Sequence, residues 1–227
     1  MPFSNKAAYI AMIGDMVHSK EIANRGEVQL QLKEVLLRIN TAYSADIAAR
    51  FMITLGDEFQ GLLHRGENTM NILGEIEQAM QPTRLRFGVG VGEITTEIDP
   101  TVPLGADGPA YYRAREMITQ LKARERKNKE AFANVMVASG AGSRYTDELL
   151  NSVLSLAGLL KEKWTRRQTE IIAAYRACGE NQYQAAEKLG IRQASVNKAL
   201  AAAGYYSYQK AVASASGFLG QIGEGNG

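Results

Sequence analysis

The 227-residue sequence contains a single cysteine, Cys178, and only two histidines. One cysteine cannot form an internal disulfide, so nothing indicates a disulfide-stabilised secreted domain, and a cytoplasmic protein is expected. His18 and His64 are far apart in the sequence and lack the short spacing of a histidine metal site. We therefore interpret both histidines as surface or hairpin-edge residues.

Long hydrophobic runs are also missing. The most apolar segment, residues 149–160, is interrupted by three polar residues and is shorter than the ~20 residues needed to span a bilayer. The first apolar run, residues 7–13, is ended by Gly14 and Asp15 and does not follow a basic segment. We expect neither a secretion signal nor a membrane partner.

Charge is unevenly distributed along the chain. Residues 161–212 contain nine Lys and Arg against four Asp and Glu, whereas residues 1–160 contain seventeen against nineteen. A basic C-terminal third beside a mildly acidic remainder indicates a polyanionic partner for that third only.

Two adjacent carboxylates occupy a glycine-containing turn within residues 54–60, Thr-Leu-Gly-Asp-Glu-Phe-Gln. Apolar, strand-like runs flank this turn, and Gly56 at the first central position suits a two-residue type II′ hairpin. A Gly-Asp pair between strands is often only a turn. Asp57 and Glu58 nevertheless make the hairpin tip a candidate metal and phosphate site.

The remaining pattern predicts an α+β fold. Residues 8–13 are apolar at every position, which is typical of a strand buried on both faces with Asp15 at its C-terminal end. Helices are predicted over residues 25–43, 68–80 and 110–123, and further strands over residues 48–54, 59–64, 85–92 and 134–138. The resulting β-α-β-β-α-β-α-β order predicts a ferredoxin-like sheet covered by helices on one face. Gly88, Gly90 and Gly92 alternate along one strand and leave a bare stripe that another backbone or a ligand can approach.

Residues 166–208 carry the most specific pattern in the chain. Helices are predicted over residues 167–178, 183–189 and 193–203, with a sharp turn at Gly190. This pattern resembles bacterial helix-turn-helix regulators, in which the third helix enters the major groove of double-stranded DNA. The resemblance implies the following DNA-binding residues: Arg192, Gln193, Ala194, Asn197 and Lys198. A three-helix unit that binds protein, or nothing, is the alternative.

The predicted strand order brings the acidic residues together. The first strand pairs with the central hairpin, which places Asp15 beside Asp57 and Glu58. Mg²⁺ and Mn²⁺ prefer carboxylate oxygens, and two ions ~4 Å apart can clamp a triphosphate. We therefore expect Mg or Mn with a nucleotide as the cofactor, and these three carboxylates as metal ligands.

The N-terminal pattern resembles the class III nucleotidyl cyclase and GGDEF diguanylate cyclase superfamily, in which an Asp ends the first strand and a Gly-Asp-Glu-type hairpin supplies a second metal ligand. The wider pattern is similar to the SatD family, through residues 9–15, Ser19, residues 53–62, 86–90, 95–96, 107–110 and 114–115. Together the resemblances imply a nucleotide site with these cofactor-binding residues: Gly14, Ser19, Gly56, Arg86, Asp107 and Arg115. In an enzyme, Asp57 and Glu58 would be the catalytic candidates.

One departure from the cyclase pattern bears on catalysis. Active class III cyclases place an Asn four residues before an Arg on the helix that follows the glycine-rich strand. Aligning that Arg with Arg115 puts Tyr111 at the Asn position, so one stabiliser of transition-state charge is missing. We interpret the protein as a DNA-binding transcriptional regulator with a nucleotide-sensing domain. The alternatives are a nucleotidyl cyclase or nucleoside triphosphate hydrolase, and a degenerate cyclase fold that serves as a dimerisation scaffold.

Four segments follow from this interpretation. Residues 1–145 form the cyclase-like domain, residues 146–164 a linker helix that is either packed or dimeric, and residues 165–212 the helix-turn-helix domain. Residues 213–227 are rich in glycine without apolar periodicity and predict a frayed tail. A homodimer is expected, because one helix-turn-helix reads only half of an operator.

Overall fold

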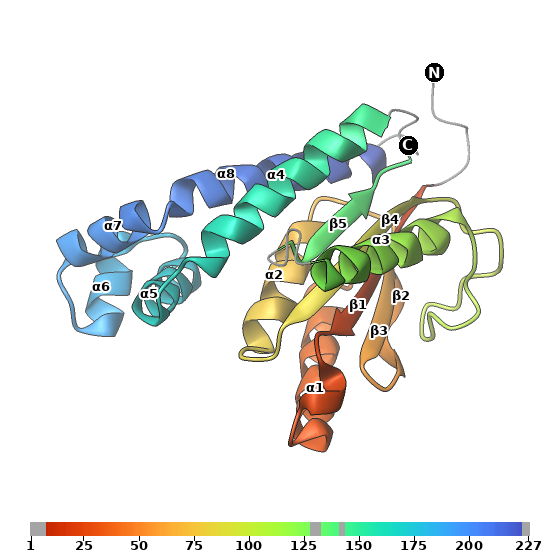
Figure 1. The fold of residues 1–227 in the computed structure, drawn as a ribbon, viewed down its shortest axis with the longest axis horizontal. Coiled ribbons are helices and arrows are strands. Elements are labelled where there is room, and N and C mark those ends of the chain that lie inside the picture. The colour runs from red at the N-terminus through yellow and green to blue at the C-terminus, as the bar shows by residue number, and fades with distance from the viewer. Residues whose placement is uncertain (1–7, 128–132, 141–143, 224–227) are drawn as a thin grey trace.

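The computed structural model describes residues 8–127, 133–140 and 144–223, which form a mixed α+β fold (Figure 1). The elements are β1 (Tyr9–Met16), the 3-10 helix η1 (Ser19–Glu21), α1 (Arg25–Ala42), β2 (Ile47–Leu55), β3 (Glu58–Leu63), α2 (Thr69–Ala79), β4 (Leu85–Gly92), α3 (Pro109–Arg126), β5 (Val135–Ala138), α4 (Arg144–Glu162), α5 (Arg166–Ala177), α6 (Gln182–Leu189), α7 (Gln193–Ala202) and α8 (Tyr205–Gly223). The predicted order of strands and long helices is confirmed from β1 to β5.

β1 lies in the middle of a five-stranded sheet with the order β2-β3-β1-β4-β5. It pairs antiparallel with β3 and with β4, whereas β5 runs parallel to β4. Leu55 and Glu58 are ladder partners, so β2 and β3 are joined by two residues, and Gly56 has a φ of 58°. Positive φ favours glycine. The predicted position of the hairpin turn is therefore confirmed.

Helices cover both faces of the sheet, so the prediction of a single covered face is wrong. Ile10 and Met12 of β1 belong to the core beneath α1 and α2, whereas Ala11 and Ile13 belong to a second core beneath α3. Successive strand residues point to opposite faces. A strand that is apolar at every position must therefore be packed against other elements on both faces. α1 and α2 pack on one face of the sheet, and α3 packs on the other.

The bare glycine stripe of β4 lies directly under α3. A Cβ atom added to Gly88 would be 2.2 Å from the carbonyl oxygen of Ala114, and one added to Gly90 would be 2.2 Å from that of Ala110. Only glycine permits a helix backbone to approach a strand this closely. The sequence left open whether a backbone or a ligand approaches these glycines, and in the structure the backbone of α3 does so.

α4 covers the outer edge of β5 with polar side chains. The Asn151 amide donates to the Val137 carbonyl and accepts from the Val137 amide, both at 2.8 Å, and Asp147 accepts from the Ser139 amide at 3.0 Å. These bonds satisfy backbone groups that an exposed edge would leave unpaired. Although α4 carries the most apolar run of the sequence, neither it nor any other helix of the described residues is long and apolar enough to cross a membrane.

α5, α6 and α7 form a unit with its own apolar core. The core includes Ile172, Val196 and Leu200, and Gly190 at the turn between α6 and α7 has a φ of 63°. Thr165 caps α5 in a capping box with Gln168. In Figure 1 this three-helix unit lies at the end of the α4–α8 pair.

The prediction of a frayed tail from residue 213 is wrong, because α8 continues to Gly223. Ala215 and Leu219 are 1% and 0% exposed and belong to the same core as Ile10. A Cβ atom added to Gly66 would lie 2.1 Å from the Leu219 carbonyl oxygen. Apolar side chains therefore anchor the end of α8, although the glycines and serines around them obscure the pattern in the sequence. Residues 224–227 of the predicted tail lie outside the described residues.

Candidate functional site

Three carboxylates lie at the end of the sheet where β1 stops and the hairpin turns. Asp15 is the ladder partner of Glu58, and the Met16 amide donates to the Asp57 carbonyl at 3.1 Å. Ser19 Oγ, from η1, donates to Asp57 Oδ2 at 2.5 Å. We call Asp15, Asp57 and Glu58 the acid cluster. Its members come from two elements far apart in the sequence and are brought together by the central position of β1.

Asp15 is buried among cations. Its side chain is 6% exposed, and its Oδ2 lies 2.5 Å from Arg86 Nη1 and 3.1 Å from Lys122 Nζ. Arg86 also donates through Nε to Glu125 at 2.9 Å. A buried charge is stable only when it is paired. Arg86 is therefore held between two carboxylates, one on the central strand and one on α3.

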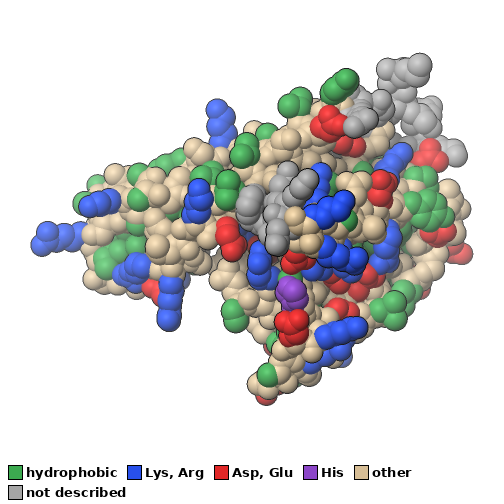
Figure 2. Space-filling view, viewed as in Figure 1, with side chains coloured by type: hydrophobic (Ala, Val, Ile, Leu, Met, Phe, Trp, Pro, Cys, Tyr) green, Lys and Arg blue, Asp and Glu red, His purple; other side chains and the backbone are tan. Residues whose placement is uncertain are grey.

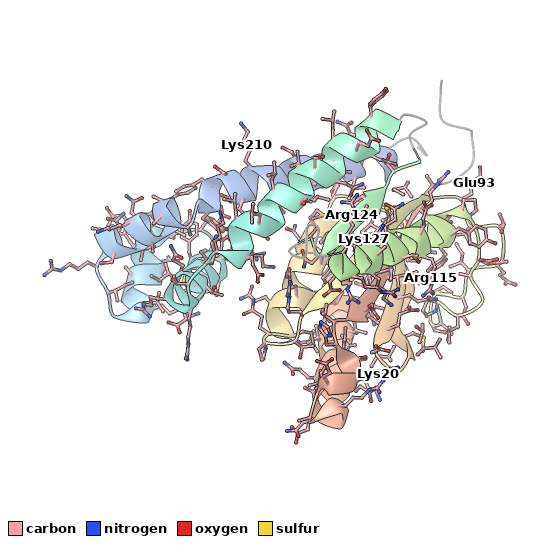
Figure 3. All side chains as sticks on the ribbon, in the orientation of Figure 1. Lys20, Glu93, Arg115, Arg124, Lys127 and Lys210 are labelled. Atoms are coloured by element: carbon pink, nitrogen blue, oxygen red, sulfur yellow. The ribbon has the colours of Figure 1, made fainter. Side chains whose placement is uncertain are left out.

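Positive side chains surround the acid cluster. Arg115 reaches from α3 to Glu58, with 2.5 Å between Nη1 and Oε2, and its side chain is 51% exposed (Figure 3). Arg25, at the start of α1, is exposed and lies beside the hairpin, since a Cβ atom on Gly56 would be 2.9 Å from its Nη2. Figure 2 shows Lys and Arg side chains gathered around α3 on the visible face. This surface suits an anionic ligand.

The acid cluster contains hard oxygen donors, which suit Mg²⁺ or Mn²⁺. Each donor already has a partner: cations for Asp15 and Glu58, and the Ser19 hydroxyl for Asp57. Among the described residues, no group of three or more His, Cys, Asp or Glu side chains is arranged to hold a metal ion. The chemistry of the donors fits the ion, and binding it requires these carboxylates to exchange partners. The metal ligands therefore stay a prediction.

Two of the predicted cofactor-binding residues, Gly14 and Asp107, have close neighbours within the protein itself. A Cβ atom on Gly14 would lie 2.0 Å from Phe59 Cζ, so Gly14 makes room for an aromatic ring of the core. Asp107 accepts a hydrogen bond from the Tyr112 hydroxyl at 2.6 Å, at the start of α3. That end of the sheet is ~20 Å along β4 from Arg86. The structure does not bring Asp107 to the acid cluster.

Tyr111, at the position where the cyclase pattern has an Asn, is a core residue. It is 7% exposed and packs with Ala11 and Ile13 beneath α3. Its hydroxyl has no hydrogen-bond partner among the described residues, and burial raises the pKa of this phenol. Tyr111 therefore stays neutral and serves packing, in agreement with the missing stabiliser noted from the sequence.

Four of the predicted DNA-binding residues lie on the first turns of α7, and the fifth, Arg192, is the N-cap residue that precedes it. Arg192, Ala194, Asn197 and Lys198 are exposed, whereas Gln193 is half-buried. Gln193 Nε2 donates to Gln182 Oε1 at 2.6 Å. Four of the five side chains are thus exposed, whereas Val196 and Leu200 of the same helix are buried. Their role in binding DNA stays a prediction.

Several residues of these sites carried no signal that sequence reasoning could use. Lys122 and Glu125 are part of a charged helix end, and their partners Asp15 and Arg86 are distant in sequence. Gln182 is another such residue, because it lies outside the turn between α6 and α7 that defines the C-terminal pattern. It accepts a hydrogen bond from Gln193, and its Nε2 donates to the Tyr206 hydroxyl at 2.9 Å. Charge alternation on a helix shows which residues can pair but not which strand they will meet.

The chain is similar to one family model and, more weakly, to two solved structures. No curated protein matches it. Among solved structures, a bacterial light-regulated adenylyl cyclase is similar, with 14% identity, a TM-score of 0.41, and coverage of 58% of this chain and 75% of that one. A regulator of polyketide synthase expression from Bifidobacterium adolescentis has 13% identity, a TM-score of 0.27, and coverage of 96% and 86%. The family model described as the SatD family matches residues 9–219, and the chain belongs to that family.

Proposed function

We propose that this protein is a DNA-binding regulator whose α/β domain binds a nucleotide. The observation that carries the proposal is the set of exposed polar and positive side chains on α7. This helix follows a tight turn at Gly190 in a three-helix unit whose apolar core is separate from that of the sheet. This arrangement suits a helix-turn-helix with α7 as the recognition helix. Asn197 can pair with adenine, the Ala194 methyl can contact thymine, and Lys198 can reach guanine or phosphate.

DNA binding can be tested by fluorescence anisotropy with labelled duplex. Affinity should fall steeply as the salt concentration rises, because each neutralised phosphate releases counterions. Lys198→Glu should weaken binding by about tenfold or more, since it places a negative charge against the duplex. Lys210→Glu makes the same charge change on α8, where Figure 3 shows Lys210 pointing away from the three-helix unit, and should retain affinity. Normal operator binding by Lys198→Glu would overturn α7 as the recognition helix.

A nucleotide fits the acid cluster through an exchange of ion-pair partners. Phosphate oxygens can take Arg115 and Lys122, whose side chains are 51% and 36% exposed. That exchange leaves Glu58 and Asp15 with oxygen atoms for the Mg²⁺ or Mn²⁺ that accompanies the phosphates, together with Asp57. The ion would offset part of the negative charge of the triphosphate, and the freed Arg115 and Lys122 would offset more of it.

Calorimetric titration with each nucleoside triphosphate, with and without Mg²⁺, tests this site. Asp57→Asn should weaken Mg²⁺-dependent binding by about tenfold, because it removes a charged oxygen ligand. Asp107→Asn removes the same charge at the opposite end of the sheet and should leave affinity unchanged. Turnover to a cyclic product, pyrophosphate or phosphate that Asp57→Asn abolishes would establish the enzyme alternative instead. If neither nucleotide nor metal binds, the remaining alternative is a degenerate cyclase fold that serves as a dimerisation scaffold.

A homodimer is part of the proposal, and α4 offers the surface for it. Tyr145, Leu149 and Leu156 are 76%, 70% and 63% exposed, and their spacing places them along one side of the helix. A second copy seated on this side would present two three-helix units to two half-sites. Sedimentation should show a dimer that Leu149→Asp with Leu156→Asp dissociates. Leu37→Asp, an exposed leucine on α1, is the matched control.

A further inference from the structure

A cleft of about 340 Å³ lies between the α/β domain and the three-helix unit. One wall is formed by α2 and by the residues that lead into β4, and the other by α5 and the first turns of α8. The size is within the ~300–1,000 Å³ that is usual for small-molecule sites. No residue of the acid cluster lines the cleft, so it is separate from the proposed nucleotide site.

Three aromatic rings line the cleft and hold one another in place. The rings of Trp164 and Tyr208 meet edge to face with 4.9 Å between centroids, and Tyr205 lies 6.2 Å from Trp164. Trp164 Nε1 is satisfied by the Ala203 carbonyl at 2.7 Å. Rings fixed in this way offer a planar ligand a large apolar contact at little cost in side-chain entropy.

Three cations also line the cleft, and they differ in their partners. Lys161 is ion-paired with Glu77, and Arg84 lies 4.0 Å from Glu162. The Arg176 guanidinium makes neither a hydrogen bond nor an ion pair with any residue of ranges 8–127, 133–140 and 144–223. Arg176 is half-buried and its guanidinium stays protonated, so the cleft presents a cation without a direct ion-pair partner among the described residues.

Arg176 spans the cleft from one half of the molecule to the other. It comes from the last turn of α5, and its Nη2 would lie 3.8 Å from a Cβ atom on Gly74 of α2. The nearby tyrosines do not balance its charge, because burial raises the pKa of both Tyr205 and Tyr208 and keeps them neutral. The Tyr205 hydroxyl donates to Glu180 Oε1 at 3.5 Å, and the Tyr208 hydroxyl is the one that can donate to an anion beside the guanidinium.

We propose that this cleft binds a small organic anion in which a carboxylate or phosphate is attached to a planar ring. Arg176 pairs with the oxyanion, since guanidinium matches the geometry of either acid group. Trp164, Tyr205 and Tyr208 contact the ring. Because the two walls belong to different halves of the molecule, the bound anion fixes the three-helix unit against the α/β domain. The inference concerns a second site and does not depend on nucleotide binding at the acid cluster.

Trp164 is the only tryptophan in the chain, so its fluorescence reports directly on the cleft. The full chain is titrated with benzoate and, separately, with phenyl phosphate. We expect a saturable change in emission with at least one probe, and the tighter probe identifies the preferred acid group. Absence of a saturable change with both probes at millimolar concentration would overturn the site.

Variants make the test specific to the cleft. Arg176→Gln should weaken probe binding by about tenfold or more, through loss of the charge-assisted contact. Arg166→Gln on the same helix, whose side chain is 95% exposed, should leave it unchanged. Ala173→Phe fills the cleft and should also remove binding, with the melting temperature of each variant showing that it folds. Equal probe affinity in Arg176→Gln and the unchanged protein would overturn the assignment.

Discussion

One ion pair at the sheet end of the molecule is buried, whereas the charged side chains at the start of α7 are exposed. Asp15 and Arg86 have side chains that are 6% and 12% exposed and form an ion pair, whereas Arg192 and Lys198 are exposed to solvent. Loss of one partner from a buried pair leaves an uncompensated charge, while an exposed cation adds little to stability. The comparison teaches that the same residue types can hold a fold together in one region and stay available to an external anion in another.

The largest effect should come from breaking the buried pair. Asp15→Ala should lower the free energy of unfolding by ~3–5 kcal/mol, because Arg86 and Lys122 lose their shared partner. Lys198→Ala should change it by no more than ~0.5 kcal/mol. Urea denaturation of both variants measures the contrast. Similar values for the two would mean that the sheet-end charges are no more structural than those of α7.

A second test concerns the boundary between the two regions. Leu219→Ala should cost ~2–5 kcal/mol, since this side chain is 0% exposed and packs with the core of the sheet although it follows the three-helix unit in sequence. Leu149→Ala, with a side chain 70% exposed on α4, serves as the control and should cost under ~0.5 kcal/mol in the monomer. If Leu219→Ala left the free energy of unfolding unchanged, the end of α8 would not be packed in the core of the sheet.

Close packing under α3 predicts a smaller effect. Gly88→Ala should destabilise the protein by ~1–3 kcal/mol, because the new methyl group meets the Ala114 carbonyl. Gly217→Ala, where nothing lies within 4 Å of the added atom, should instead stabilise α8 by ~0.5–1 kcal/mol. Thermal melting distinguishes the two signs. Two shifts of the same sign would mean that α3 does not lie against β4 as described.

The smallest expected change in stability is at the rim of the acid cluster. Arg115→Gln breaks an ion pair whose arginine is half exposed, and should cost less than ~1 kcal/mol. Its effect on nucleotide affinity, measured by calorimetry, should exceed its effect on unfolding. The reverse result would assign Arg115 to the fold and remove it from the proposed site.

Local sequence pattern predicted the elements better than their contacts. The apolar run of β1 and the turn at Gly56 were predicted because both depend on neighbouring residues. The glycine stripe predicted a close approach but not that α3 makes it, since a long loop separates α3 from β4. Lys122 and Asp107 show why the site residues were harder to predict than the elements. Lys122 contacts Asp15 although no motif marked it, whereas Asp107 lies away from the acid cluster. Which end of the sheet a residue reaches depends on strand direction and helix placement, which no short motif encodes.

The central claim is that nucleotide at the α/β domain regulates DNA binding by α7. The most direct measurement is duplex affinity at fixed salt, with and without the nucleotide and Mg²⁺ that the protein binds most tightly. Linked sites should differ by ~1–3 kcal/mol in the free energy of DNA binding, and Asp57→Asn should abolish that difference. DNA binding that is equally tight with and without bound nucleotide would contradict the claim.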